Sequence, residues 1–323
     1  KIDIAENIVI SAADDLGFVY ALLKISEKYL DINGNEDIRT LKHAFLNSYF
    51  QTGLKSNIDE AVINHINEHG LSELSEKYTK IDEIPFDFAR RRLSVIVSDG
   101  QKTQMITKGA VEEILGISTM VDYQGNVSPI TNAIKENIKK ITKDLNKQGL
   151  RVVAVCQKNN LEKTSEFTVS DEKNMILIGF IGFLDPPKES AKSSIEKLNK
   201  NGIRVIVLTG DNVEVTKCIC DKVGIKSPQI VIGSQIDKLQ DIAVKRLLKK
   251  TNIFAKLSPI QKARIIRLLR DSGNVVGYMG DGINDSPSLI NSDVGISVDT
   301  AVDIAKESAD IILLEKDLHV LLD

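Results

Sequence analysis

The sequence predicts two domains of different class, a mixed α+β domain over residues 1–184 and an α/β domain over residues 185–323. In the second half, short apolar runs alternate with segments of helical spacing, which is typical of a parallel sheet with helices on both faces. In the first half, strand-like runs flank Asp99-Gly100, a dipeptide that favours an antiparallel hairpin. Between the halves, Asp185-Pro186-Pro187 ends a strand, because two prolines fix the chain direction and remove donors.

Composition excludes several classes of protein. Of the 323 residues 42% are hydrophobic. The formal net charge is -3, so the chain lacks the excess of basic residues that would predict a nucleic-acid partner. The longest mostly apolar run, Met175 to Leu184, is shorter than the roughly 20 residues that cross a bilayer. Cys156, Cys218 and Cys220 match neither a disulfide framework nor a zinc pattern, and we predict that they are packing residues.

The elements of the first half follow from periodicity and turn residues. Strands are expected over Leu93–Ser98, Gln101–Lys108, Val152–Cys156 and Ile176–Leu184. Helices are expected over Gly17–Tyr29, Asp59–Glu68 and Pro129–Lys147. The spacing predicts a mostly antiparallel sheet with helices packed against it.

The elements of the second half alternate regularly. Strands are expected over Ile203–Leu208, Ile230–Ile232, Ile253–Phe254, Val275–Met279, Val294–Val298 and Ile311–Leu314. One helix carries Ala191, Ile195 and Leu198 on a single face and is expected to end at Gly202. Another is expected to begin after Ser258 as N-cap, with Pro259 at its first position and Gln261 completing a capping box.

Polar residues gather where two of these strands end. Val275–Met279 runs into Gly280-Asp281-Gly282-Ile283-Asn284-Asp285, which places two carboxylates and a carboxamide close together. Such oxygens are ligands that Mg²⁺ prefers, although Asp, Asn and Gly also make ordinary turns. Thr209-Gly210-Asp211 follows Ile203–Leu208, so the two clusters share one crevice if the strands are neighbours. Lys262 either points a cation at this edge or is solvated on an exposed helix face.

Taken together, these motifs resemble the large cytoplasmic loop of a P-type ATPase. The resemblance rests on Thr209-Gly210-Asp211, the Gly280–Asp285 hexapeptide, Asp185-Pro186-Pro187 and Lys108-Gly109-Ala110, and it covers the whole chain. It is strongest to bacterial magnesium-transporting members. That narrower resemblance rests on Ile84-Pro85-Phe86-Asp87-Phe88 with the following arginines, on Gly182 to Glu189 and on Asp293 to Leu318. A calcium pump is the alternative within the family.

The resemblance implies a division of labour. Residues 1–184 would be the nucleotide-binding domain, and residues 185–323 a phosphorylation domain of haloacid-dehalogenase-like fold. ATP and Mg²⁺ would be the cofactors, and the γ-phosphoryl group would pass to an Asp to drive Mg²⁺ transport. The partners would be the actuator domain and the membrane helices that bind the transported divalent cation. The parent would be a multi-pass protein of the cell membrane, with this portion soluble on the cytoplasmic side.

The resemblance also assigns the phosphoryl site. Asp281 would bind Mg²⁺, and Asn284 and Asp285 would support the metal, with Asp285 as a second metal-site carboxylate. Thr209 and Gly210 would donate hydrogen bonds to phosphoryl oxygens, and Asp211 would accept them from substrate or water. Lys262 would neutralise the charge of the transferring group.

The nucleotide site is assigned in the same way. Phe86 would stack on adenine, Lys108 would lie at the floor of the pocket, and Gly109 would allow close backbone approach. Arg151 would reach the phosphates, Arg91 would lie near the nucleotide, and Asp59 near the adenine or ribose. Without the resemblance, Phe86 would be predicted as a core residue and Asp59 as an acid on a helix surface. The four histidines, His43, His65, His69 and His319, match nothing in this chemistry.

One departure from the family pattern concerns the nucleophile. The family's phosphorylated Asp lies in an Asp-Lys-Thr-Gly-Thr segment, which the 323 residues do not contain. We therefore expect a pump fragment that binds adenine nucleotide weakly without forming a phosphoenzyme, and whose phosphorylation domain lacks its central strand. Asp185 is rejected as a substitute because two prolines follow it. A dehalogenase-like phosphatase is a second interpretation. A regulatory nucleotide-binding module is a third, although no Walker-type or Gly-x-Gly-x-x-Gly loop occurs.

Overall fold

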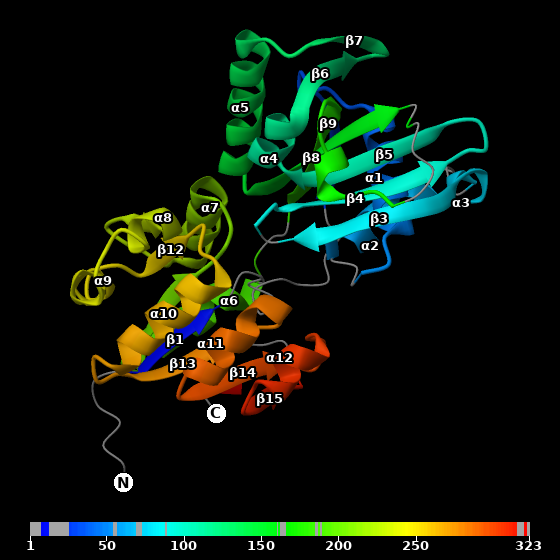
Figure 1. The fold of residues 1–323 in the computed structure, drawn as a ribbon. Helices are drawn as coiled ribbons and strands as arrows, with labels where there is room; N and C mark the ends of the chain where they lie inside the picture. The colour runs from blue at the N-terminus through cyan, green and yellow to red at the C-terminus, as the bar shows by residue number, and fades with distance from the viewer. Residues whose placement is uncertain are drawn as a thin grey trace. The chain divides into compact units, whose positions relative to one another are not determined.

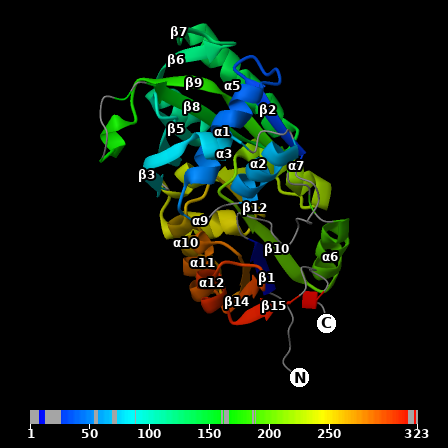
Figure 2. The same ribbon diagram turned by 90° about the vertical axis from the view of Figure 1, so that its right-hand side faces the viewer.

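The computed structural model describes residues 8–12, 26–53, 57–68, 73–87, 89–159, 161, 166–184, 187, 189–314 and 320–321. Within them the chain forms two compact units (Figures 1 and 2). One comprises Ile25–Asn146 and Leu150–Leu184, and the other comprises Lys147–Gly149 and Asp185–Asp323, which residues 8–12 join. Asp185 and Pro186, the expected boundary, and most of the helix expected over Gly17–Tyr29 lie outside the described residues.

The first unit is built on a mostly antiparallel sheet. Its strand order is β3-β4-β5-β8-β9-β6-β7, with β2 also paired to β9 and with β6 parallel to β9. The strands are β2 Ser26–Asp31, β3 Thr79–Asp87, β4 Arg92–Ser98, β5 Thr103–Ala110, β6 Ser118–Tyr123, β7 Asn126–Pro129, β8 Leu150–Asn159 and β9 Met175–Leu184. The helices are α1 Ile38–Phe50, α2 Asn57–Glu68, α3 Leu74–Lys77, α4 Val111–Ile117, α5 Asn132–Lys147 and the 3₁₀ helix η1 Val169–Asp171.

The two faces of this sheet carry separate cores. Val95 and Ile106 pack with residues of α1 and α2 on one face. Ile96 and Met105, their neighbours along β4 and β5, pack with residues of α4 and α5 on the other. This alternation follows from the strand period of two, which sends successive side chains to opposite faces. The sheet is therefore covered by a separate apolar core on each face.

The hairpin predicted at Asp99-Gly100 joins β4 to β5. Gly100 has φ +86°, a left-handed conformation that glycine adopts without steric cost. Asp99 Oδ1 accepts bonds from the backbone N–H groups of Gln101 and Lys102, at 2.9 and 2.8 Å. The helix expected over Gly17–Tyr29 is wrong at its end, because Ser26–Asp31 is strand β2. Strand β2 pairs with the buried strand β9, with Ser26 opposite Leu184 and Asp31 opposite Gly179. This tertiary pairing overrides the helical pattern of the sequence.

The second unit contains a parallel sheet in the order β11-β12-β10-β1-β13-β14-β15. The strands are β1 Ile8–Ala12, β10 Ile203–Leu208, β11 Ile230–Ile232, β12 Ile253–Ala255, β13 Val275–Met279, β14 Val294–Val298 and β15 Ile311–Leu313. The helices are α6 Glu189–Lys200, α7 Val213–Val223, α8 Gly233–Ile236, α9 Asp241–Leu248, α10 Pro259–Arg270, α11 Ser286–Asn291, α12 Asp303–Glu307 and the 3₁₀ helix η2 Ile283–Asp285. In Figure 2, α6 lies on one side of this sheet and α10–α12 on the other.

The expectation that the sheet lacks its central strand is wrong for this structure. β1 fills that position and pairs in parallel with β10 on one side and β13 on the other. A gap there would leave two rows of buried backbone donors and acceptors unpaired, at a cost comparable to one lost hydrogen bond per group. Residues 8–12 satisfy them, which is why this early segment belongs to the second unit.

Candidate functional site

The two polar loops of the second unit lie at one rim of the parallel sheet. β1 separates β10 from β13, so these strands are not the direct neighbours that a shared crevice required. Ala12 pairs with Val207 on one side and with Met279 on the other, and the two strands therefore end level. Two strand spacings put the loops about 10 Å apart. Thr209 and Asp281 consequently lie at the same carboxyl edge of the sheet, with the single strand β1 between them.

Backbone contacts with β12 and the residues after it fix the Thr209 loop. The N–H of Thr209 donates to Phe254 O at 3.0 Å, and Lys256 N donates to Asp211 O at 2.9 Å. The buried Thr209 hydroxyl accepts a bond from Asp211 N at 3.1 Å. Asn212 then caps α7 by accepting from Val215 N at 2.9 Å. Backbone bonds to β12 and to Lys256 therefore hold Thr209 and Asp211 in place at the end of β10.

A buried ion pair anchors the hexapeptide loop. Lys262 Nζ lies 3.1 Å from Asp285 Oδ1, and both side chains are buried. The buried Tyr278 hydroxyl donates to the same oxygen at 2.8 Å, and Gly282 N donates to Asp285 Oδ2 at 3.2 Å. These contacts exclude the alternative that Lys262 is solvated on an exposed helix face.

The N-terminal cap of α10 explains the position of this lysine. Ser258 Oγ accepts from Gln261 N at 3.3 Å, and Gln261 Oε1 accepts from Ser258 N at 2.8 Å, as the capping-box pattern predicts. The cap fixes where the helix begins. It thereby places Lys262 in the first turn, at the end of the helix that meets the rim.

Gly280 allows the loop to close on itself. A Cβ at this position would lie 2.5 Å from Asp285 Cβ and 2.8 Å from its Cγ, closer than real Cβ contacts. Asp281 and Asn284 are half-buried beside this contact. The loop therefore requires glycine at its first position, because Asp285 packs directly against it.

The donor set fits Mg²⁺ better than a metal that needs a closed protein cage. Asp281 and Asp285 are both carboxylates, but the described part of the chain shows no group of three or more His, Cys, Asp or Glu arranged to hold a metal ion. Mg²⁺ commonly takes one or two carboxylates and completes its shell with water and phosphate oxygens. Asp285 already accepts bonds from Lys262, Tyr278 and Gly282, which ties this carboxylate to the loop and to α10.

In the first unit, Lys108 on β5 joins two helices. Its ammonium group contacts the carboxylate of Asp59 on α2 and the hydroxyl of Ser48 on α1, the latter at 2.7 Å. Asp59 is 4% exposed, so the alternative of an acid on the helix surface is wrong. Burial lowers the pKa of Lys108, while the Coulombic attraction of Asp59 acts in the opposite direction. The two predicted residues thus form one buried charge pair.

Phe86 and Gly109 lie at the β3–β4–β5 edge of the same sheet. Phe86 is 49% exposed, which excludes the core alternative. A Cβ on Gly109 would lie 2.5 Å from Arg92 Cβ and 2.6 Å from Arg91 O, so the strands approach closely there. Arg91 is exposed and has φ +50°, and its carbonyl accepts from Ala110 N at 3.0 Å. Arg151 is half-buried on β8, opposite Phe183 of β9.

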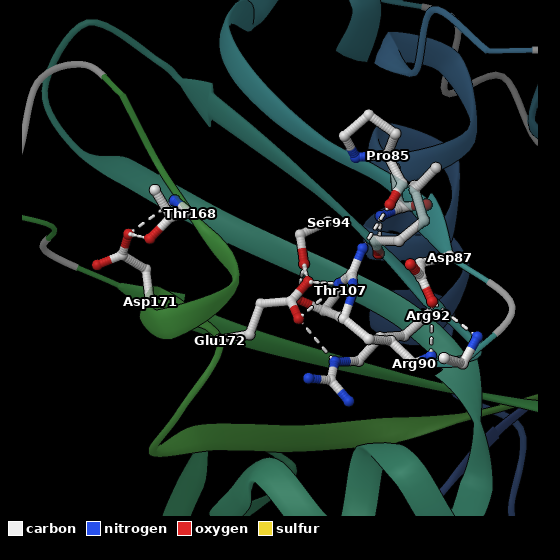
Figure 3. Close-up of polar contacts among 12 residues, drawn as sticks. Pro85, Asp87, Arg90, Arg92, Ser94, Thr107, Thr168, Asp171 and Glu172 are labelled. Carbon is white, nitrogen blue, oxygen red and sulfur yellow. Dashed lines mark hydrogen bonds and ion pairs between the residues drawn. The ribbon is translucent and has the colours of Figure 1, made fainter.

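Sequence reasoning missed several residues that complete these sites. Ser48 and Tyr278 complete the two lysine environments, but a serine in a helix and a tyrosine in an apolar strand carry no distinguishing signal. Glu172 was also missed, although it binds Arg90 and Arg92 next to the predicted residues (Figure 3). Its segment contains no motif, and only the fold brings it to β4.

Neither the histidines nor the cysteines were assigned a part in the predicted chemistry, and the cysteines were predicted to be packing residues. His43 is bonded to Arg39 O at 2.7 Å and to the Gln157 amide at 2.8 Å. Cys156 and Cys220 are buried, which raises the pKa of each thiol to about 12, and Cys218 is half-buried. His69 and His319 lie outside the described residues. None of the helices in the described ranges is long and apolar enough to span a membrane.

Comparison with known proteins identifies the family of the chain. A family model described as "P-type ATPase, cytoplasmic domain N" matches residues 20–190. The "Magnesium-transporting ATPase, P-type 1" of Escherichia coli (strain K12) is 46% identical over 298 residues, which cover 92% of this chain and 33% of that protein. The protein of the same name from Salmonella typhimurium is 47% identical over the same shares.

More distant relatives are named as transporters of another ion, calcium. "Calcium-transporting ATPase 1" of Bacillus cereus is 30% identical over 296 residues, 88% of this chain and 33% of that protein. The chain thus spans about a third of the length of the curated relatives it matches. The family model alone covers more than half of the chain. The chain therefore belongs to the P-type ATPase family.

Proposed function

We propose that this chain is the ATP-using catalytic portion of a magnesium-transporting pump. The observation that carries the proposal is the 46% identity over 298 residues to a magnesium-transporting ATPase, against 30% to a calcium-transporting one. The buried lysine–carboxylate pairs in both units support it, because phosphoryl transfer depends on positioning and on neutralisation of charge.

The unit with the antiparallel sheet would be the nucleotide-binding domain, over residues 1–184 without the segment 8–12 that joins the other sheet. The unit with the parallel sheet would be the phosphorylation domain, over residues 185–323 with that segment added. A haloacid-dehalogenase-like fold for the second unit is supported by a parallel sheet whose polar loops follow β10 and β13. Ligands of such sheets bind beyond the carboxyl ends of the strands.

In the phosphorylation domain, Lys262 would neutralise the charge of the transferring phosphoryl group. Asp285 would hold that ammonium group in place and support the loop with Asn284. Thr209 and Gly210 would donate to phosphoryl oxygens, and Asp211 would accept from substrate or water. Asp281, with Asp285 behind it, would hold Mg²⁺, which when bound supplies positive charge beside the phosphate.

In the nucleotide-binding domain, the exposed ring of Phe86 would stack on adenine. Lys108 would form the floor of the pocket, with Asp59 keeping it charged and oriented. Gly109 would let the base or ribose approach the backbone. Arg91 and Arg151 would supply cations toward the phosphates.

The remaining steps would be carried out by parts of such a pump that these 323 residues do not include. They are the Asp-Lys-Thr-Gly-Thr acceptor, the actuator domain and the membrane helices that bind the transported cation. The parent protein would lie in the cell membrane, with this portion on the cytoplasmic side.

Nucleotide titration tests the binding site directly. We expect ATP to bind the chain in isothermal titration calorimetry, and Phe86→Ala to weaken it by roughly tenfold, since base stacking on an aromatic is worth about 1–3 kcal/mol. Lys108→Ala should also weaken it. Ile81→Ala is the matched control, because Ile81 is a 41% exposed apolar residue of the same strand. Unchanged affinity in the Phe86 and Lys108 variants would refute the pocket.

Two further assays separate the alternatives. The full-length pump should restore growth at low magnesium to a bacterium that lacks its own magnesium uptake. ATP-dependent calcium accumulation in vesicles, without that rescue, would favour the calcium pump. Hydrolysis of small phosphate esters by this chain, dependent on Mg²⁺ and lost in Asp281→Asn, would favour the phosphatase.

A further inference from the structure

The first unit contains a buried charge cluster that the proposed chemistry leaves unused (Figure 3). We call it the Glu172 cluster, and its members are Glu172, Arg90, Arg92, Ser94 and Thr107. The Glu172 side chain is 0% exposed, and those of Arg90 and Arg92 are 15% and 12% exposed. A buried carboxylate is costly unless it is paired and hydrogen-bonded. Here the carboxylate forms ion pairs with the guanidinium groups of Arg90 and Arg92, which compensate its burial.

Both oxygens of Glu172 are fully engaged. Arg90 Nη1 donates to Oε1 and to Oε2, each at 2.8 Å, and Arg92 Nε donates to Oε2 at 2.7 Å. Ser94 Oγ donates to Oε1 at 2.6 Å and is itself 2.7 Å from Thr107 Oγ1. Charge-assisted bonds of this kind are short and directional. The carboxylate thus fixes the orientation of both arginine side chains.

A local cap holds Glu172 at the end of η1. Thr168 N donates to Asp171 Oδ2 at 2.8 Å, and Asp171 N donates to Thr168 O at 2.9 Å, as Figure 3 also shows in part. Glu172 N then donates to Val169 O at 3.2 Å. The segment is therefore built to present this one carboxylate to β4.

Arg90 carries the effect of the cluster to the backbone of β3. Its Nη2 donates to Pro85 O at 2.6 Å, on the residue directly before Phe86. The Arg92 side chain bonds to the same carboxylate, but no bond from that side chain to β3 appears among the contacts of the described residues. The two arginines differ in this respect, although both hold Glu172.

Pro85 and Phe86 form an irregularity in the β3–β4 ladder. Ile84 pairs with Ser94 and Asp87 pairs with Arg92, so three steps along β3 oppose two along β4. Such a bulge inserts an extra residue and re-aims a side chain. Ile84 packs in the core on the α4–α5 face, and without the bulge Phe86 would point to that face too.

With the bulge, Asp87 pairs with Arg92 and shares its face, the α4–α5 face, and from the alternation along β3 we infer that Phe86 faces the other way. That other face is the one on which Lys108 meets Ser48 of α1 and Asp59 of α2. The irregularity is thus what places the exposed aromatic ring and the buried lysine on one side of the sheet.

We propose that Glu172 is a positioning residue for nucleotide binding, which orients Arg90 so that its guanidinium pins the Pro85 carbonyl and aims Phe86 at the Lys108 face. This inference rests on the proposed role of Phe86 in stacking on the base. Glu172 itself would touch no nucleotide, because its side chain has no exposed surface and lies on the opposite face.

Fluorescence tests the positioning step without any nucleotide. The chain contains no tryptophan, so Phe86→Trp introduces a single reporter at the bulge. In this background, Arg90→Lys keeps the charge but cannot hold Glu172 and Pro85 together, because lysine lacks the planar fork of arginine. We expect lower anisotropy and faster acrylamide quenching of the introduced indole. Arg92→Lys is the matched control and should leave both unchanged.

Affinity tests the consequence for binding in the chain with Phe86 restored. Arg90→Lys and Glu172→Gln should each lower the affinity for ATP by about tenfold, the scale of one lost base stack. The affinity for inorganic tripolyphosphate should change by no more than about twofold. In a Phe86→Ala background the same substitutions should have almost no further effect, since coupled residues are not additive. Urea denaturation checks that each variant is folded, and Arg90→Lys decides the matter if Glu172→Gln does not fold.

Two results would overturn the proposal. One is an Arg92→Lys variant that lowers the indole anisotropy and the affinity for ATP as much as Arg90→Lys does. The cluster would then only stabilise the fold. The other is an equal loss of ATP and tripolyphosphate affinity. If the unaltered chain binds no ATP while the indole reporter still responds only to Arg90→Lys, the proposed function fails and the positioning of residue 86 stands.

Discussion

The ammonium group of Lys262 lies 3.1 Å from Oδ1 of Asp285, and neither side chain has more than 2% of its surface exposed. The pair joins the first turn of α10 to η2, and the Tyr278 hydroxyl of β13 donates a second contact to the same oxygen. Its geometry is that of a buried ion pair that is satisfied within the protein. A buried pair of this kind is costly to desolvate, so retaining it is consistent with a role in chemistry.

Removing one partner of this pair should be severely destabilising. Lys262→Met leaves the Asp285 carboxylate buried without a cation, and we expect a loss of about 3–5 kcal/mol in the free energy of unfolding. Combining it with Asp285→Asn should restore part of that loss, since no uncompensated charge remains. Urea denaturation measures both.

A surface pair provides the matched control for that experiment. Lys306 lies 3.1 Å from Asp303, the same separation, but Asp303 is 93% exposed. Lys306→Met should therefore change stability by no more than about 1 kcal/mol. Equal losses in the two methionine variants would show that burial does not govern the strength of the Lys262 pair.

Gly109 should not tolerate even one added carbon. In Gly109→Ala the new Cβ would meet Arg92 Cβ at 2.5 Å and Arg91 O at 2.6 Å, and backbone atoms cannot move aside as a flexible side chain can. We expect a loss of about 1–3 kcal/mol, the usual cost of overpacking. Thermal and urea unfolding are the measurements.

Gly116 is the matched control because it lies in the exposed part of α4 with nothing within 4 Å of an added Cβ. Gly116→Ala should stabilise by up to about 1 kcal/mol, since alanine has the higher helix propensity. A Gly109→Ala variant as stable as the Gly116→Ala variant would contradict the close approach of β4 and β5.

His43 should make stability depend on mildly acidic pH. Burial lowers its pKa below the ordinary value of 6.5, and the hydrogen bonds to Arg39 and Gln157 offset this only in part. Between the lowered pKa and 6.5 the unfolded chain binds a proton that the folded chain does not, so stability falls as pH drops through this window. The slope is at most about 1.4 kcal/mol per pH unit.

The measurement is the free energy of unfolding at pH 7.5 and 5.5. His43→Gln should show a smaller difference between the two values than the unaltered chain, because glutamine does not titrate. Identical pH dependence in the two proteins would mean that the unfolded and folded states hold the His43 proton equally well.

The strands of the parallel sheet could be predicted almost to the residue. β10, β11, β13 and β14 have the predicted bounds, and β12 and β15 differ by one residue at the end. Short strands buried on both faces are continuous apolar runs, which stand out between polar helix surfaces. β1 and β2 were missed because their pairing partners lie far along the chain, β10 and β13 for one and β9 for the other.

The candidate site could be predicted only in part, and the reason is geometric. Asp281 was singled out by the acidic loop that follows a buried strand, and Lys108 by the family resemblance alone, and whether they act as functional sites stays a prediction. The sequence could not predict Glu172, Ser48 and Tyr278, because each acts through a contact that only the folded chain makes.

The sequence by itself determined the alternation of strands and helices, the cap that places Lys262 and the glycines at the two loops, because these depend on neighbours within a few residues. Only the tertiary structure decided that β1 separates the two polar loops, that Asp59 and Lys262 are buried in ion pairs, and that the β3–β4 ladder shifts its register at Pro85 and Phe86. Burial, strand register and charge pairing join residues distant in sequence, so no local pattern encodes them.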